Sequence, residues 1–380
     1  MERKMATIQK IRDIRPIEGA DKIELATVNS WNVVVAKDVG HSIGDWIVYC
    51  EIDSFLPIKP EFEFLRKTSF KRMGDTEGFR LKTIRMRGQF SQGLILPIKV
   101  LEGPDEYKLG ISHQPHGDVY QIGPYDDALI IAEGVDVSEL LGIVKYEPPI
   151  PASLAGVMKG NFPSFLRKTD EERIQNLTDE YEEFKKMNTK WYSTEKLDGS
   201  SSSFYNRIKE FGVCSRNIEL ARPEPFVEED VVGNDGKVRK TTENTFWKVA
   251  RENGIEERLS TFEDFNISVQ GELIGEGVQK NMYNLKGHSV RMFNLFDIDN
   301  QKWVEFEEFE RLCDYFDFET VPVLDRDFQL PDTIEELIEI ADGKSVLNKD
   351  RWREGIVIRS YDRNVSFKVI SNKFLSRSKD

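Results

Sequence analysis

The chain has 380 residues, of which 39% are hydrophobic and 11% aromatic, so it can bury a large core and its length suggests at least two domains. Its formal net charge of −14 argues against a protein that coats nucleic acid by overall electrostatic attraction. No apolar run approaches the roughly 20 residues that cross a bilayer, and the N-terminus lacks a signal-peptide core. We therefore expect an intracellular, cytoplasmic protein with no membrane partner.

Cysteine and histidine usage gives no sign of a disulfide framework or a structural metal site. Cys50, Cys214 and Cys313 are odd in number, far apart and outside any CxxC pattern. None of the four histidines pairs with a cysteine at the spacing of metal ligands. Reduced thiols, typical of the cytosol, are expected.

The first part of the chain, from residue 6 to about residue 98, is expected to consist of short strands. Its strand-like segments are rich in β-branched and aromatic residues and are separated by turn residues. Five short strands suggest a small barrel, and the OB-fold is the commonest such barrel that also binds nucleic acid. Residues 101–133, which carry many Gly, Pro and Asp, are interpreted as an insertion of loops and a hairpin. The five predicted strands are residues 6–17, 23–28, 31–37, 45–52 and 93–98.

Two stretches of the chain are basic despite its net acidity. Between residues 66 and 87, eight cations are accompanied only by Asp75 and Glu77, and a second basic stretch covers residues 351–379. Either stretch is compatible with a solvated surface or with a nucleic-acid contact. The candidates for such a contact are Arg80, Lys82, Arg85 and Arg87 in the first stretch and Lys373 in the second.

A domain boundary is predicted after residue 147, where three prolines, Pro148, Pro149 and Pro151, stiffen the chain and forbid helix. This gives a nucleic-acid-binding domain of OB type at residues 1–147 and a second domain at 148–380. In the second domain, strands outnumber helices in an irregular order, which favours an α+β domain with antiparallel sheets. Its predicted strands are residues 201–208, 211–217, 266–275, 289–298, 354–360 and 365–370.

Four helices are predicted in the second domain. The clearest covers Asp170–Met187, because Thr169 and Glu172 form a capping-box pattern and apolar residues recur on one face. The other three lie around residues 245–252, 305–316 and 333–341.

The stretch Thr194–Ser203, "TEKLDGSSSS", begins a series of unusual motifs. Alone it is weak, since Asp-Gly is a common hairpin turn and serines are common in loops. Each later motif, taken singly, also has a structural explanation. The series in chain order is Lys-x-Asp-Gly at 196–199, Ser-Arg at 215–216, Gly-Glu at 271–272, Phe-x-x-Phe-Asp-Ile at 293–298, Glu-Gly-Ile-Val-Ile at 354–358 and Phe-Lys at 367–368.

The order of these six motifs resembles that of the covalent nucleotidyltransferase superfamily, the ATP-dependent ligases and capping enzymes with an ATP-grasp-like catalytic domain. The chemistry asks for the same residue types. A lysine that attacks the α-phosphate of ATP must be neutral, so its pKa must fall from about 10.4. Lys368 and a divalent metal, Mg²⁺ or Mn²⁺, would favour the neutral form of Lys196 and bind the phosphate charge.

The resemblance also implies the roles of the remaining site residues. Lys196, Glu354 and Lys368 are expected to be catalytic, and Glu354 and Glu272 to bind the metal. Glu272 would bind a ribose hydroxyl, Phe293 would stack on adenine, and Arg216 would hold the ribose or the 5′-phosphate. The full set expected to bind ATP, or AMP as the lysyl adduct, is Arg173, Glu195, Lys196, Asp198, Gly199, Ser201, Arg216, Glu272, Phe293 and Lys368.

Within the superfamily the chain is most similar to the fifth family of RNA ligases, which carry an N-terminal OB domain. The segments that carry this similarity include "GADKIELATV", "GDWIVYCEIDSFLP", "DVSELLGIVKYEPP" and "FPSFLRKTDEERIQN". DNA ligases and capping enzymes instead carry an OB domain after the last motif, and few residues follow Lys368 here. The resemblance implies a monomeric ATP-dependent RNA ligase that joins 3′-OH and 5′-phosphate ends of broken RNA or nicked duplexes, with RNA on the 3′-OH side.

Two features depart from the family pattern or stay open. Many RNA ligases have two lysines separated by one residue in the last motif, whereas Val369 and Ile370 follow Lys368, so the role of Lys373 is open. Arg173 either reaches the triphosphate or pairs with nearby acids. Two other functions are considered, a catalytically inactive nucleic-acid-binding protein and a GTP-dependent capping enzyme.

Overall fold

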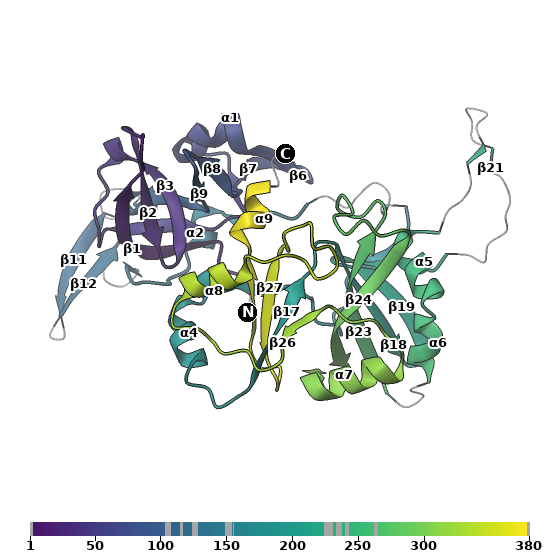
Figure 1. Ribbon diagram of the computed structural model, residues 1–380. Coiled ribbons are helices and arrows are strands. Elements are labelled where there is room, and N and C mark those ends of the chain that lie inside the picture. The colour runs from purple at the N-terminus through teal and green to yellow at the C-terminus, as the bar shows by residue number, and fades with distance from the viewer. Residues whose placement is uncertain are drawn as a thin grey trace. The chain divides into compact units, whose positions relative to one another are not determined.

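The computed structural model describes residues 3–102, 108–114, 117–123, 128–148, 154, 156–223, 231–232, 238–239, 243–261 and 265–377. The chain divides into a first unit, Met1–Pro149, and a second unit, Ile150–Asp380 (Figure 1). Both units consist mainly of antiparallel sheets with a few helices, which confirms the predicted α+β class. Among the described residues, no helix combines the length and the apolar character that a membrane crossing requires.

The first unit contains a curled sheet made of all five strands predicted from the sequence. Every neighbouring pair is antiparallel, and the order is β10-β4-β1-β2-β3. The two edges approach each other, since the backbone N–H of Gln92 donates to the Asn32 carbonyl at 2.8 Å. Trp31 and Tyr49 are among the buried residues inside this curl. The strands are β1 (Ala6–Pro16), β2 (Ile23–Val28), β3 (Trp31–Ala36), β4 (Trp46–Cys50) and β10 (Leu94–Pro97).

Between β4 and β10 the chain forms short elements that the sequence did not predict. The basic stretch of residues 66–87 belongs to this region. A four-stranded sheet has the order β14-β5-β7-β6, and β8 pairs with β9 as a separate hairpin. The elements between β4 and β10 are β5 (Ser54–Pro57), η2 (Pro60–Leu65), α1 (Arg66–Ser69), β6 (Phe70–Met73), β7 (Thr76–Arg80), β8 (Ile84–Met86) and β9 (Gln89–Ser91); β14 (Val144–Lys145) joins the four-stranded sheet from later in the chain.

The region predicted as an insertion contains a three-stranded antiparallel sheet, β11-β12-β13. Residues 103–107, 115–116 and 124–127 of this region lie outside the described part of the chain. Its strands are β11 (Leu109–Gln114), β12 (Gly117–Ile122) and β13 (Leu129–Ile130), with η3 (Ile98–Leu101) before them and α2 (Ser138–Leu141) after them.

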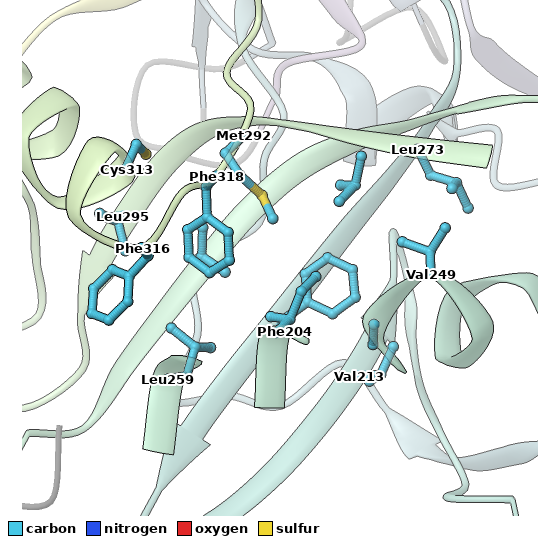
Figure 2. Packing of buried hydrophobic residues seen from close by; sticks show 14 of the residues in the cluster. Phe204, Val213, Val249, Leu259, Leu273, Met292, Leu295, Cys313, Phe316 and Phe318 are labelled. Carbon is cyan, nitrogen blue, oxygen red and sulfur yellow. The ribbon is translucent and has the colours of Figure 1, made fainter. Parts of the chain in front are cut away.

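The second unit contains a seven-stranded antiparallel sheet in the order β15-β20-β19-β18-β23-β24-β25. Helices α5, α6 and α7 pack on one face of it, over the core that Figure 2 shows around Phe204. The strands are β15 (Met158–Asn161), β18 (Ser200–Arg207), β19 (Glu210–Ser215), β20 (Ile218–Leu220), β23 (Ile267–Gly275), β24 (His288–Asp297) and β25 (Lys302–Trp303); the helices are α5 (Thr245–Glu252), α6 (Ile255–Ser260) and α7 (Phe306–Tyr315).

A five-stranded sheet with the order β16-β28-β27-β17-β26 completes the second unit. A separate core, which includes Trp191 and Phe367, lies between one face of this sheet and helices α4 and α8. The elements are β16 (Glu172–Arg173), α4 (Thr178–Phe184), β17 (Trp191–Lys196), β26 (Val323–Asp325), α8 (Ile334–Ala341), β27 (Gly355–Ser360), β28 (Ser366–Ile370) and α9 (Asn372–Arg377); β21 (Val231–Val232) and β22 (Val238–Arg239) pair only with each other.

The predicted helix over Asp170–Met187 is wrong in its first half. Residues 172–173 form β16, which pairs in parallel with β28, and only Thr178–Phe184 is α-helical. The Thr169 hydroxyl does not cap a helix, because it lies 2.6 Å from the Ser201 hydroxyl. The apolar period has a different basis: Ile174, Leu177, Tyr181 and Phe184 pack into one core across the 3₁₀ turn η6 (Ile174–Asn176) and α4.

The other three helix predictions are confirmed. Helix α5 has the predicted bounds, and α7 and α8 each lie within one residue of theirs. The capping box that the sequence placed at Thr169 occurs at α8 instead, where Thr333 and Glu336 bond reciprocally.

We predict that Phe204→Ala lowers the free energy of unfolding of the second unit by about 3–5 kcal/mol, because the Phe204 ring is fully buried between the sheet and its helices. Ile208→Ala is the control: this side chain is 71% exposed, so its removal should change stability by less than about 0.5 kcal/mol. Urea unfolding curves of both variants measure the difference. If both variants lost the same free energy of unfolding, the assignment of Phe204 to the centre of this core would be contradicted.

Candidate active site

Lys196 is the last residue of β17, and the chain then crosses from the five-stranded sheet to the seven-stranded sheet. Asp198 and Gly199 are therefore not a hairpin turn, because the strands on either side belong to different sheets. A Cβ atom at Gly199 would lie 2.4 Å from the Leu273 carbonyl oxygen, so only glycine fits at this crossing. The backbone N–H of Asp198 donates to the Tyr283 hydroxyl at 2.6 Å, which holds the crossing in place.

Strand register places Lys196 and Lys368 on the same face of the five-stranded sheet. Thr194 pairs with Val357, which pairs with Lys368, while Lys196 lies two residues further along β17. Because side chains alternate along a strand, residues two apart point to the same side. The sequence prediction that these lysines act together thus has a geometric basis.

The last motif differs from the family pattern in a definite way. Ile370 occupies the position two residues after Lys368, on the face of Lys196 and level with it. Lys373 belongs to α9 instead, and its Nζ lies 4.4 Å from the centre of the Trp352 ring. The chain therefore brings an aliphatic side chain, and not Lys373, to the place of the second lysine.

Carboxylates from three segments surround the Lys196 ammonium. Its Nζ lies 2.6 Å from Oε2 of Glu354, the residue before β27. Burial lowers the pKa of Lys196, but Glu354, Glu272 and Asp198 outweigh burial and raise that pKa above the ordinary value. The ligand-free site therefore holds a protonated lysine, and the low pKa that nucleophilic attack requires is not a property of this state.

Two of these carboxylates hold their protons unusually well. Burial, reinforced by the neighbouring carboxylates, raises the pKa of Glu272 to about 8 despite the attraction of Lys196. Burial and Glu354 raise the pKa of Asp198 to about 6. Such crowded, incompletely neutralised carboxyl groups would be stabilised by additional positive charge.

The site offers few protein ligands for a metal ion. Within the described ranges, no three His, Cys, Asp or Glu residues come together in a group that could hold one. Glu354 and Glu272 are nevertheless hard oxygen donors, which suits Mg²⁺ or Mn²⁺, and a bound cation would favour loss of the Glu272 proton. Mg²⁺ commonly binds through one or two carboxylates, with water and substrate phosphates as its other ligands. The residues present fit a metal of that kind.

Residues Thr169–Arg173, here named the strap, join the two sheets beside this site. The Thr169 hydroxyl bonds to Ser201 of β18, and Asp170 forms an ion pair with Arg216 at 2.5 Å. These two contacts attach the strap to the seven-stranded sheet. Ser201 and Arg216, both predicted nucleotide ligands, thus each contact the strap in the ligand-free structure.

The other end of the strap is attached to the five-stranded sheet. Glu171 forms an ion pair with Arg359 of β27 at 3.0 Å and also accepts from the Ser366 hydroxyl. Arg173 pairs with Lys368 between β16 and β28. Glu171 and Arg359 were not among the predicted site residues, because neither belongs to the six motifs. The available signal was an arginine inside a strand whose other residues are buried.

Phe293 lies at a β-bulge in β24. Gln270 pairs with Asn294 and Gly271 with Met292, which leaves Phe293 as the extra residue. Its half-buried ring packs with a cluster that includes Leu197, the neighbour of Lys196. Bulges redirect side chains, and this one turns the Phe293 ring toward the cluster that contains Leu197.

Phe293 is also close to Arg359, whose guanidinium lies 5.8 Å from the ring centre. Arg359 is only 3% exposed and donates to the Thr194 hydroxyl at 3.1 Å. The buried guanidinium thus links the aromatic ring to the strap.

Glu195 is buried, and its contacts differ from those expected. Its N–H donates to the Pro322 carbonyl at 2.9 Å, and its Oε2 accepts from the Val346 N–H at 2.7 Å. The N–H and Oε2 of Glu195 are therefore hydrogen-bonded, and the side chain binds the backbone N–H of Val346.

In the first unit, the residues predicted to contact nucleic acid differ in exposure and in whether they are already paired. Arg80 is paired with Asp53 at 2.7 Å and its guanidinium lies 4.4 Å from the Tyr146 ring centre. Lys82 is exposed. Partial desolvation by the surrounding protein, together with the nearby cations Arg80 and Lys71, lowers its pKa. Arg85 and Arg87 are exposed on the β8–β9 hairpin.

Family models match two parts of the chain. An OB-fold domain model matches residues 5–98, and an RNA ligase model matches residues 189–370. The first range contains the curled sheet, and the second contains the six motifs. Curated protein sequences give no significant match.

Solved structures of the RNA ligase of Naegleria gruberi resemble the whole chain. An apo variant is 37% identical over 100% of both chains, with a TM-score of 0.79. A variant with AMP and Mn is 37% identical over 99% of both chains, with a TM-score of 0.79. A variant with ATP and Mn is 38% identical over 100% of both chains, with a TM-score of 0.77.

We predict that the ligand-free, metal-free protein loses stability as the pH rises from about 4.5 to about 8. Folded Glu272 keeps its proton up to a pKa of about 8, whereas the unfolded chain releases it near 4.5, so folding binds a proton within this window. The Glu272→Gln variant should lack the part of the pH-dependent loss of stability that comes from Glu272. Unfolding temperatures between pH 5 and 8 measure the effect, with Glu276→Gln, an exposed neighbour, as the control. Parallel profiles for wild type and Glu272→Gln would contradict the raised pKa.

Proposed function

The chain belongs to the RNA ligase family, and from that premise we propose that it uses ATP to join RNA 3′-OH and 5′-phosphate ends through a covalent Lys196–AMP intermediate. The observation that carries the proposal is Lys196 itself. It ends β17 on the same face as Lys368 and among three carboxylates, and Phe293 packs against the cluster that contains its neighbour Leu197. Solved relatives with ATP or AMP and Mn support ATP and a divalent cation as cofactors.

The first step is proposed to be adenylylation of Lys196. Its ammonium, paired with Glu354, must lose a proton before the Nζ lone pair can attack the α-phosphorus. An N–P bond forms, the bond between the α-phosphorus and the bridging oxygen breaks, and pyrophosphate leaves with that oxygen. Lys368, which lies on the same face, would stabilise the charge that develops on the phosphate, and Arg173 on the adjoining strand would bind pyrophosphate.

A metal ion held by Glu354 and Glu272 would supply positive charge that favours neutral Lys196 and stabilises the phosphate oxygens. Phe293 would offer a face for stacking adenine, and its packing against the cluster that contains Leu197 supports this role. Arg359 supports Phe293 from within the protein.

Two further steps complete the proposed reaction. An oxygen of the RNA 5′-phosphate attacks the phosphorus of Lys196–AMP, so the N–P bond breaks and lysine is regenerated. The RNA 3′-hydroxyl, which loses its proton, then attacks the activated 5′-phosphorus, and AMP leaves. The substrate we propose is broken RNA or a nicked duplex with RNA on the 3′-OH side of the nick.

The proposed enzyme is an intracellular monomer. Its three cysteines are buried and form no disulfide, which suits a reducing compartment.

We predict that the protein gains the mass of one adenylyl group when it is incubated with ATP and Mn²⁺, and that Lys196→Ala abolishes the gain. Lys186→Ala, which removes an exposed lysine of the same unit, should leave it unchanged. Intact-protein mass spectra measure both. Labelling by GTP instead of ATP would favour a capping enzyme, and RNA binding without any adduct would favour an inactive binding protein.

We predict that Arg85→Glu with Arg87→Glu weakens sealing of a nicked duplex but leaves Lys196 adenylylation intact, because the β8–β9 hairpin is exposed and belongs to the first unit. RNA affinity should fall and its salt dependence should become shallower, by about 0.9 per lost phosphate contact in duplex. Lys22→Glu with Lys37→Glu, a matched charge change elsewhere in the first unit, is the control. If adenylylation falls together with sealing, the hairpin supports the fold rather than the substrate.

A further inference from the structure

A cluster on the second unit joins one tryptophan with two lysines from separate elements. The Nζ atoms of Lys344 and Lys373 each lie 4.4 Å from the centre of the Trp352 ring. Both lysines are exposed, and the ring is half-buried. These three residues are named the Trp352 cluster.

The backbone around the cluster is held by specific contacts. Lys344 and Trp352 form an isolated β-bridge, which closes the loop between them. Arg353 donates to the carbonyls of Ile340 and Ala341 at the end of α8. A Cβ atom at Gly343 would lie 2.5 Å from the Arg353 guanidinium, so glycine is required for that contact.

Lys373 reaches the same ring from helix α9, which follows Trp352 in the chain. Asp342, which follows α8, accepts from the Ser371 hydroxyl at 2.6 Å and from the Lys373 N–H at 3.0 Å. This carboxylate therefore positions the first turn of α9 beside the loop. The β-bridge brings Lys344 to Trp352, and the Asp342 hydrogen bond to α9 brings Lys373 to the same ring.

The cluster is electrostatically uncompensated. Within the described part of the chain, neither Lys344 nor Lys373 forms an ion pair, although Lys344 donates to the Asp350 carbonyl at 3.2 Å. Lys349 and Arg351, on the same loop, are exposed and likewise form none there. The two ammonium groups lie no further apart than twice their distance to the ring centre. Two adjacent ammonium groups that form no ion pair among the described residues, in a chain of net charge −14, favour a polyanionic ligand.

The loop that carries the cluster is joined to the nucleophile at two points. Trp352 is two residues before Glu354, whose carboxylate contacts Lys196. At the other end of the loop, the Val346 N–H binds the side chain of Glu195, the residue before Lys196. The loop that carries the cluster thus contacts Lys196 through Glu354 and its neighbour Glu195 through Val346.

We propose that the Trp352 cluster binds backbone phosphates of the RNA strand whose 5′-phosphate receives AMP from Lys196. This proposal rests on the function proposed above. Trp352 acts as a positioning residue, because cation–π attraction holds two otherwise flexible side chains and less conformational freedom is lost when phosphates bind. Lys344 and Lys373 contact the phosphates through their remaining N–H donors.

The test compares Lys344→Ala/Lys373→Ala with wild type in three measurements: adenylylation with ATP alone, affinity for a 5′-phosphorylated RNA, and sealing of that RNA at a nick. We expect RNA affinity and sealing to fall by about tenfold or more at low salt, and the slope of log affinity against log salt to fall by about 0.7 for each lost contact with a single strand. Adenylylation, which uses no RNA, should be unchanged. Lys302→Ala, an exposed lysine on β25, is the control.

A second pair of variants tests the positioning role without relying on the lysines. Trp352→Phe keeps an aromatic face and should retain most of the affinity, whereas Trp352→Leu should lower it by about threefold or more and leave Lys196 adenylylation in place as a sign of an intact fold. Equal affinity for the two would overturn the role of the ring.

The outcomes separate this proposal from the proposed function. If wild type forms the adduct while the double lysine variant binds and seals RNA normally, the cluster proposal is wrong and the ligase function stands. If the double variant loses adenylylation as well, the cluster acts on the phosphates of ATP, which also overturns the proposal. If wild type forms no adduct but its RNA affinity depends on the cluster, the ligase function fails and the phosphate site stands.

Discussion

The second unit depends on how a half-buried ammonium is balanced. Lys196 lies at the junction of two sheets, where burial alone would disfavour its charge, and Glu354, Glu272 and Asp198 reverse that preference. For the carboxylates, burial disfavours the charged form, and Glu272 and Asp198 therefore retain their protons at higher pH than usual. The ligand-free state is therefore a compromise among four groups, and any bound cation or phosphate must change the protonation of several of them together.

Much of the architecture was readable because strands of both units carry strong local patterns. The five predicted strands of the first unit form one sheet, and the six of the second unit are all present. A local sequence pattern could not show which distant strand a segment pairs with. Residues 172–173 have the spacing of a helix, yet they pair with β28, almost 200 residues later, because that pairing satisfies backbone groups beside the site.

The same distinction applies to the site residues. Motif order identified Lys196, Glu354, Glu272 and Lys368, which the structure brings to one place. It could not identify the Glu171–Arg359 pair, whose members are 188 residues apart and have no motif. Nor could it show that the side chain and N–H of Glu195 are already occupied, since hydrogen bonds to Val346 and Pro322 depend on the folded loops.

The bulge at Phe293 has a consequence for the length of β24. Val290 and Met292 enter the large core before the bulge and Leu295 enters it after the bulge, so the extra residue shifts the alternation by one. Replacing Phe293 would alter only the packing of its own ring, against the cluster that contains Leu197 and against Arg359. Deleting it would exchange the core and opposite faces for every later residue of the strand. At this point the number of residues is constrained as strictly as their identity, and natural insertions and deletions should avoid it.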